Sequence, residues 1–464
     1  MSYNHANQYR CTIIRGKAKN DLDNLLPTYA QIIDEITPVA SSDFASAFNS
    51  SLSVLMPEAE KKTLDNHRTE IAGKLFGMYY EQDNTIFTSE RTRKFLADND
   101  QPAFFKDMCF RFQFPNGLDK IQTLLDRLDH GVRIRPFCFT MKLVLDAYNA
   151  DIVINQNEIA YYALNNLDVL SGKATTEEVI KQIKLDRAQK IVRRVSSPDK
   201  AESYNTQHIR EQLNYLELAN LIRNNSGNIF PNLKEEAVIK QFSEKAYILG
   251  FDVYEYNLNE AEEREKFYED WQLYYSGISK KYIDRFATSV EALQYDVDET
   301  GKQISRAYAV DTMLLGDDGE ALVFKYENER ISAYDSRLTN KIHMLGKTKG
   351  LGYDILSIFA DEREETPEFA KYIEVKSTKR VTSPNIESED WVDTLNVTRN
   401  EWVAAQQYGD SFEIYRIYFT QAGPELFIIK NPFEKNERKI IKTIPTMYRL
   451  DFSSKAIDKV VSFA

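Results

Sequence analysis

Two carboxylates and a lysine on adjacent apolar segments are the residues best suited to chemistry. Asp354 lies in GLGYDILS, residues 350–357, and Glu374 and Lys376 lie in YIEVKST, residues 372–378. Side chains alternate between the faces of a strand, so we expect Glu374 and Lys376 to point the same way. Carboxylates that converge from separate strands can hold a hard divalent cation, and a nearby lysine can orient or deprotonate a water. The spacing therefore predicts metal-dependent hydrolysis of a phosphodiester.

A third carboxylate is expected from the preceding helix. Glu320 and Glu327 are seven positions apart and share one face of a helix. We expect Glu320 to support the metal and the reaction, and Glu327 to lie too far along or to pair with Lys325 or Arg330 on the surface. For Glu320 an alternative stays open, in which an acidic residue near a helix N-terminus only interacts with the helix dipole.

The metal is expected to have oxygen ligands. The cysteines, Cys11, Cys109 and Cys138, have no CxxC spacing, and the five histidines have no paired spacing. A zinc site and a disulfide framework are therefore disfavoured. Asp354, Glu374 and Glu320 suit Mg²⁺, and Mn²⁺ can substitute for it.

The segment around these residues, 313–464, has the pattern of an α/β domain. Apolar periodicity predicts a helix, three strands, a helix that starts at a Thr398–Glu401 capping box, and two more strands. Residues 433–464 are expected to form a strand or loop and a short terminal helix. We therefore expect a mixed central sheet flanked by helices.

This arrangement resembles the PD-(D/E)xK, or restriction-endonuclease-like, nucleases. More narrowly, residues 315–432 are similar to the nuclease-like C-terminal domain of the NO VEIN family. The resemblance implies a catalytic core of Asp354, Glu374 and Lys376, with Glu320 as the helix acid. Tyr353 stands where the superfamily name has proline, a position that the narrower family does not keep strictly. Gln406, on the following helix, either contacts the site or is solvated.

The N-terminal regions are expected to be mostly helical. We predict a helical region at 1–84, a DNA-recognition region at 85–235 and a charged helical linker at 236–312. A helix from His208, a turn and an extended run from Ile229 fit the second half of a winged helix-turn-helix. Short aromatic motifs in 85–235 are similar to recognition domains of AlwI-like type II restriction endonucleases.

The densest cationic run lies between residues 180 and 194. It is either a solvated helix face or a surface that contacts phosphates. Its basic residues are Lys181, Lys184, Arg187, Lys190, Arg193 and Arg194.

Composition sets the class of protein. The 464 residues are 42% apolar and 28% charged, which is typical of a globular chain of two or three domains. The net charge of −12 argues weakly against nucleic acid, because phosphate binding depends on local basic surface. We find no secretory signal and no membrane-spanning window, so we expect a cytoplasmic protein without a membrane partner.

Together these observations predict a Mg²⁺-dependent DNA endonuclease of bacterial restriction or phage-defence type. Its partner would be double-stranded DNA, and cutting both strands would need a homodimer or a transient dimer. A methyltransferase or ATPase is a further candidate partner, and cleavage of RNA stays open as an alternative. The alternative is a nuclease fold that no longer cuts and serves as a nucleic-acid-binding or scaffolding component.

Overall fold

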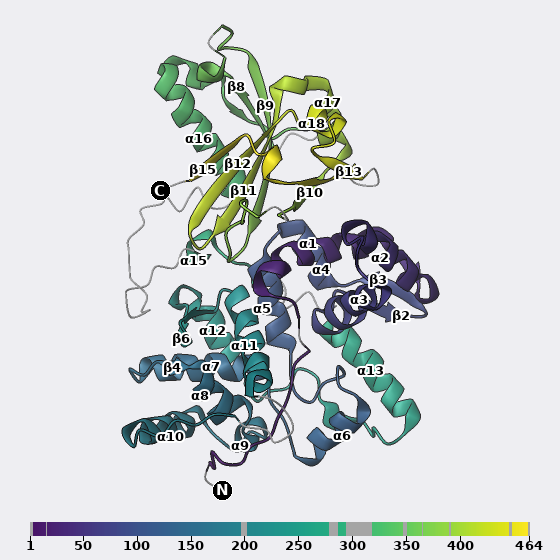
Figure 1. The fold of residues 1–464 in the computed structure, drawn as a ribbon, viewed down its shortest axis with the longest axis vertical. Coiled ribbons are helices and arrows are strands. Elements are labelled where there is room, and N and C mark those ends of the chain that lie inside the picture. The colour runs from purple at the N-terminus through teal and green to yellow at the C-terminus, as the bar shows by residue number, and fades with distance from the viewer. Residues whose placement is uncertain are drawn as a thin grey trace. The chain divides into compact units, whose positions relative to one another are not determined.

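The chain forms two compact units in a computed structural model, which describes residues 3–14, 16–195, 202–277, 286–293, 318–346, 350–363, 365–388, 391–444 and 448–462 (Figure 1). The first unit holds the described residues up to Thr288, apart from Asp23–Thr28. The second holds those residues, 289–293 and the described residues from 318 onward. The chain is therefore multidomain, as expected.

The first unit is mostly helical and contains two small sheets. Its helices are α1 (Lys19–Ile36), α2 (Ser41–Leu55), α3 (Lys61–Asn66), η1 (His67–Leu75), α4 (Glu90–Asp98), α5 (Gln101–Arg111), α6 (Ile121–Asp129), α7 (Pro136–Asn149), α8 (Gln156–Glu158), η2 (Ile159–Leu164), α9 (Leu167–Leu170), α10 (Thr176–Ala188), α11 (Glu202–Leu218), α12 (Glu236–Ser243) and α13 (Ala261–Tyr275). Its strands are β1 (Val39–Ala40), β2 (Tyr79–Gln82), β3 (Thr85–Thr88), β4 (Ile154–Asn155), β5 (Ile222–Asn225) and β6 (Asn228–Pro231).

Both small sheets have the same topology. Their strand orders are β1-β3-β2 and β4-β6-β5, and all their pairings are antiparallel. In each, a short first strand lies between helices and a later helix leads into a hairpin. Asp83 and Asn84 close the first hairpin at φ 51° and 55°, the left-handed region that a type I′ turn requires. For the second sheet the sequence predicts the helix and the extended run from Ile229, which is β6, but it predicts neither β4 nor β5. It does not predict the earlier copy of the arrangement.

Helices α12 and α13 pack inside the first unit, whereas the sequence predicts a linker from residue 236. The ring of Phe242 lies 5.2 Å from that of Phe110, and Phe267 is buried in a cluster with Leu124. Trp271 is also buried. Polar residues on the outer faces of these helices dominate the composition and conceal the apolar residues that anchor them. Residues 278–285 and 294–312 of the expected linker lie outside the described residues.

A buried charge network joins three elements of the first unit. Asp107 on α5 bonds Arg91 on α4 at 2.6 Å and Arg111 at 3.0 Å, and the Asp107 and Arg91 side chains are 1% exposed. Arg91 also donates to the carbonyl of Tyr275 at 2.7 Å. Burial alone would raise the pKa of Asp107, but the two guanidinium groups lower it. The carboxylate is therefore ionised and compensates two buried cations.

The second unit is built on a mixed six-stranded sheet of order β15-β12-β11-β9-β8-β7. Strands β9 and β11 are parallel, and the other neighbours are antiparallel. A separate antiparallel sheet has the order β10-β14-β13. The strands are β7 (His343–Met344), β8 (Ile355–Ile358), β9 (Ala370–Lys379), β10 (Asp393–Val397), β11 (Phe412–Thr420), β12 (Gly423–Lys430), β13 (Lys442–Ile444), β14 (Tyr448–Phe452) and β15 (Lys459–Ser462), and the helices are α15 (Val290–Leu293), α16 (Asp318–Asp335), α17 (Arg399–Tyr408) and α18 (Pro432–Glu437).

The expected mixed sheet with flanking helices is confirmed, and the chain end differs from the prediction. Residues 459–462 form strand β15, which pairs with β12 from Glu425 to Ile428. The sequence predicts a short terminal helix there, and this prediction is wrong. So short a segment has no clear hydrophobic period of its own from which to distinguish a helix from a strand. Its pairing comes from the open edge of β12.

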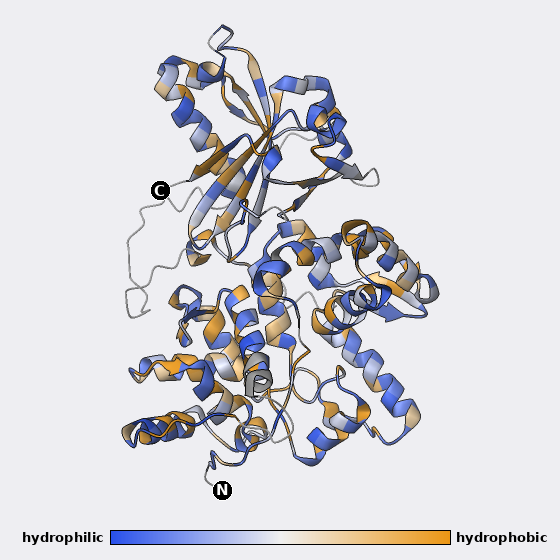
Figure 2. Cartoon of the chain, in the orientation of Figure 1, coloured by the Kyte–Doolittle hydropathy of each residue, from blue (hydrophilic) through white to orange (hydrophobic). Residues whose placement is uncertain are grey.

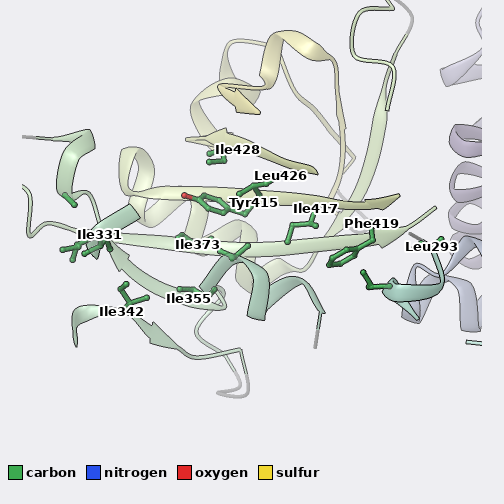
Figure 3. Packing of buried hydrophobic residues seen from close by; sticks show 14 of the residues in the cluster. Leu293, Ile331, Ile342, Ile355, Ile373, Tyr415, Ile417, Phe419, Leu426 and Ile428 are labelled. Atoms are coloured by element: carbon green, nitrogen blue, oxygen red, sulfur yellow. The ribbon is translucent and has the colours of Figure 1, made fainter. Parts of the chain in front are cut away.

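Helices cover the two faces of this sheet. Val323 and Ile331 of α16 pack with Ile373, Tyr415 and Ile417 on one face (Figure 3). Figure 2 shows apolar residues along the central strands of this sheet.

The other face packs against α17. Trp402 and Ala405 of that helix lie in a cluster with Ile414, Tyr418 and Tyr372. Strand β9 therefore points Tyr372, and with it the even-numbered residues, toward α17. In the described part of the chain, no helix is long and apolar enough to cross a membrane.

We predict that Asp107→Asn destabilises the first unit, because it leaves two buried guanidinium groups without their counter-charge. The expected loss is ~3–5 kcal/mol of unfolding free energy, measured by urea denaturation. The matched control is Asp98→Asn, which breaks an exposed pair with Lys94 and should cost less than about 1 kcal/mol. Equal losses for the two variants would contradict a structural role for the buried network.

Candidate active site

Asp354 and Glu374 are brought together by the pairing of β8 with β9. Ile355 lies opposite Ile373 in this antiparallel pair, so Asp354 lies opposite Glu374 and shares its face. The Asp354 amide donates to the Ile373 carbonyl at 2.9 Å. The Oδ2 atom of Asp354 accepts from the Val375 amide at 2.8 Å. Backbone pairing therefore fixes both carboxylates that the sequence singles out.

Lys376 lies between two glutamates. Its Nζ is 2.7 Å from Oε1 of Glu374 and 2.9 Å from Oε2 of Glu401. The Lys376 side chain is 21% exposed, whereas that of Glu374 is 3% exposed. The expected shared face of Glu374 and Lys376 is therefore present, and the lysine is nearer to solvent.

Glu401 is a member of this group that the sequence does not reveal. Its capping box with Thr398 is present as predicted. The pairing with Lys376 depends on how α17 packs on the sheet, and no local signal in the sequence reports that packing.

Burial, together with the crowding of carboxylates, governs the electrostatics here. Burial, followed by the negative charges of Asp354 and Glu401, raises the pKa of Glu374 to about 8 although Lys376 opposes the shift. Burial also raises the pKa of Asp354. Burial alone would lower the pKa of Lys376, but Glu374 and Glu401 raise it. The carboxylates outnumber the ammonium, and a bound cation would offset this excess of negative charge.

A cleft of about 150 Å³ opens over Asp354, Glu374 and Glu401. It is lined by Gly346, Gly350, Gly352, Tyr353, Asp354, Glu374, Thr398, Asn400 and Glu401. The GLGYD segment thus forms one wall, and the start of α17 forms another.

Glu320 lies at the border of this cleft. It is half-buried near the start of α16, and its carboxylate lies directly beside Gly346, which lines the cleft. Among the described residues, no three Asp, Glu, His or Cys side chains form a group that could hold a metal ion. Glu320 therefore does not converge with Asp354 and Glu374 into a ready-made cage.

Two carboxylates still fit a Mg²⁺ ion. This cation keeps several waters and is commonly held by only one or two protein carboxylates together with substrate phosphates. Asp354 and Glu374 would supply those ligands, and the excess negative charge around them suits a divalent cation.

Glu327 is buried on the opposite face of the sheet, so its expected surface location is wrong. It is 0% exposed and bonds Arg330 at 2.7 Å, as one expected pairing has it, and Lys371 at 3.3 Å. Lys371 is odd-numbered on β9 and points toward α16, away from Lys376. Gln406 is exposed on α17.

The basic run lies in the first unit, on α10 and the segment after it. Lys181, Lys184 and Lys190 are exposed. Arg187 pairs with Glu158 at 2.6 Å, and Arg193 pairs with Asp186. Arg194 is also exposed. Part of the positive charge is therefore offset within the chain.

The comparisons with known proteins decide the family of the first unit. The model for restriction endonuclease BpuJI, N terminal, matches residues 3–272, more than half of the chain.

The chain belongs to the BpuJI N-terminal family.

A solved protein chain, from a crystal structure of pyrene- and phenanthrene-modified DNA in complex with the BpuJ1 endonuclease binding domain, is 50% identical in sequence to this chain. It covers 59% of this chain and 100% of its own, with a TM-score of 0.58. The match to restriction endonucleases thus extends beyond the 85–235 region in which the sequence suggests an AlwI-like one.

The second unit matches a different family. The model for protein NO VEIN, C-terminal, covers residues 319–429, so the resemblance expected from the sequence is confirmed. No curated protein matches the chain. The paired matches show a restriction-type protein related to a DNA-binding domain.

We predict that Gly352→Ala disrupts the site. Gly352 has φ +77°, and a Cβ there would lie 2.5 Å from the Asn400 carbonyl of α17. The control is Gly350→Ala, with φ +93° but open space around its Cβ position. Both substitutions strain the backbone, and only the first displaces the cleft wall. We expect Gly352→Ala to weaken Mn²⁺ binding in calorimetry at least tenfold more than Gly350→Ala does; equal effects would contradict this.

We predict that, on α16, Glu327 has a structural role and Glu320 has a role at the site. Glu327→Gln removes a buried charge from Lys371 and Arg330 and should cost ~3–5 kcal/mol of stability. Glu320 lies at the cleft border, and Glu320→Gln should cost less than about 1 kcal/mol of stability. Thermal denaturation of both variants checks the order, and a larger loss for Glu320→Gln would refute it.

Proposed function

We propose that this protein is a Mg²⁺-dependent endonuclease of restriction or phage-defence type that hydrolyses phosphodiester bonds in DNA. The observation that carries the proposal is the group of Asp354, Glu374 and Lys376. They lie on one face of paired strands, where Asp354 and Glu374 line a cleft and Nζ of Lys376 lies 2.7 Å from Glu374. The same chain carries a unit of the BpuJI N-terminal family. A PD-(D/E)xK site on a DNA-recognition protein is the simplest function that uses both.

The residues would divide the chemistry as follows. Asp354 and Glu374 would hold Mg²⁺, which Mn²⁺ could replace, with Glu320 reaching the site from its border. When bound, the cation would lower the pKa of a water and neutralise charge on the phosphate. Lys376 is paired with two carboxylates and so keeps its proton. We therefore assign Lys376 to orienting the water and stabilising negative charge, not to removing a proton.

The first unit would recognise double-stranded DNA. The order of helices and strands around each of its small sheets supports a winged-helix assignment, and modules of that kind would place a helix in the major groove. The related BpuJ1 binding domain is in complex with DNA. Lys181, Lys184 and Lys190 are exposed and would contact phosphates. Cutting both strands would need two sites, hence a homodimer or a transient dimer, and a methyltransferase or ATPase partner could control it.

Two observations favour a second candidate, a nuclease fold that binds nucleic acid without cutting. Among the described residues no three potential ligands form a metal group, and Lys376 already neutralises Glu374. In that case the carboxylates would not take up Mn²⁺.

The test is nicking of supercoiled plasmid with Mg²⁺, using modified and unmodified DNA. We expect Asp354→Asn and Lys376→Met to lower the rate at least ~10²-fold, because each removes charge at the reacting phosphate. Both variants should still shift DNA in a gel with Ca²⁺. Glu329→Gln, on the exposed side of α16, is the matched control and should cut like wild type. Failure of wild type to cut any of these DNAs would refute the endonuclease proposal.

A further inference from the structure

We propose that Glu401 is a positioning residue that holds Lys376 at the site from helix α17. The inference rests on the proposed endonuclease function and deepens it. Glu401 would keep the ammonium in place once a cation has engaged Glu374.

The geometry fixes Glu401 in two directions. Its Oε2 atom accepts from the Thr398 amide at 2.9 Å and lies 2.9 Å from Nζ of Lys376. The hydroxyl of Thr398 accepts in turn from the Glu401 amide at 3.3 Å. The side chain is 14% exposed. The carboxylate is therefore held by the first turn of α17 before it contacts the lysine.

The two partners of Lys376 are not equivalent. Glu374 lies on the same strand, opposite Asp354, and is the residue that would share its charge with a metal. Such sharing weakens the attraction between Glu374 and the ammonium, because the cation repels it. Glu401 belongs to another element and lines the same cleft. It would then supply the attraction that keeps a flexible lysine chain directed at the reacting phosphate.

The chain contains a matched capping box without this arrangement. Thr175 and Glu178 cap α10 in the first unit, with bonds of 2.9 and 3.2 Å that parallel those of Thr398 and Glu401. Glutamine serves in such a box as well as glutamate. Glu401→Gln therefore removes the charge and keeps the cap, and Glu178→Gln measures what the same change does to a cap alone.

The first measurement is steady-state cleavage by the full-length variants. We expect Glu401→Gln to lower kcat about 10–100-fold, as loss of a group that orients a reactive residue does. KM for DNA and the melting temperature should stay at the values of Glu178→Gln. A fall in kcat explained by unfolding would instead lower the melting temperature. Cleavage by Glu401→Gln at the wild-type rate overturns the positioning role and leaves the endonuclease proposal standing.

The second measurement is a double-mutant cycle that needs no DNA. Glu401→Gln, Lys376→Met and the double variant are compared by urea denaturation and by Mn²⁺ calorimetry. If Glu401 acts through Lys376, its substitution has little effect in the Lys376→Met background, and the coupling is about fivefold or more in the unfolding equilibrium constant.

An equal effect of Glu401→Gln in both backgrounds overturns the inference, since Glu401 would then act without the lysine. If wild type cuts no DNA, the endonuclease proposal fails on its own assay. The cycle still decides separately whether Glu401 holds Lys376.

Discussion

The alternation of side chains along β9 is the constraint on which the second unit depends. β9 lies inside the sheet between β8 and β11, so both of its faces are covered. Lys371 and Lys376 lie five positions apart and therefore point to opposite faces. Each ammonium is taken from bulk water and requires carboxylates nearby. The positions of the acidic residues on α16, α17 and the neighbouring strands follow from that requirement.

The two lysines meet this need for carboxylates in different ways. Lys371 belongs to a buried structural network, whereas Lys376 belongs to the candidate active site. Lys371 is 0% exposed and lies within 4 Å of Glu327, Glu362 and Glu413. The hydroxyl of Tyr415 also bonds Glu327, at 2.8 Å. Such an enclosed network fixes α16 on the sheet but offers no room for a substrate. Lys376 instead contacts Glu374 and Glu401, two carboxylates that line the cleft.

The sequence is informative where a function depends on period and order within one segment. The spacing of Glu374 and Lys376 alone places them on one face, and the strand order then brings Asp354 opposite. The roles of Glu327 and Glu401 depend on which face each helix covers, a tertiary choice that helical periodicity does not encode. The charged surface of α13 similarly conceals Phe267 and Trp271, so composition suggests a linker where the structure has a packed helix.

The division into two cores explains how one chain can combine matches to two different families. The BpuJI match ends at residue 272 and the NO VEIN match begins at 319, and each lies essentially within one unit. The buried pairs of Asp107 and Lys371 follow the same division. Asp107 pairs with arginines of the first unit, to which it belongs, and Lys371 pairs with acidic residues of the second unit, to which it belongs. The printed counter-charges of Asp107 and of Lys371 therefore come from the unit to which each residue belongs, so each of these buried pairs can form within its own core.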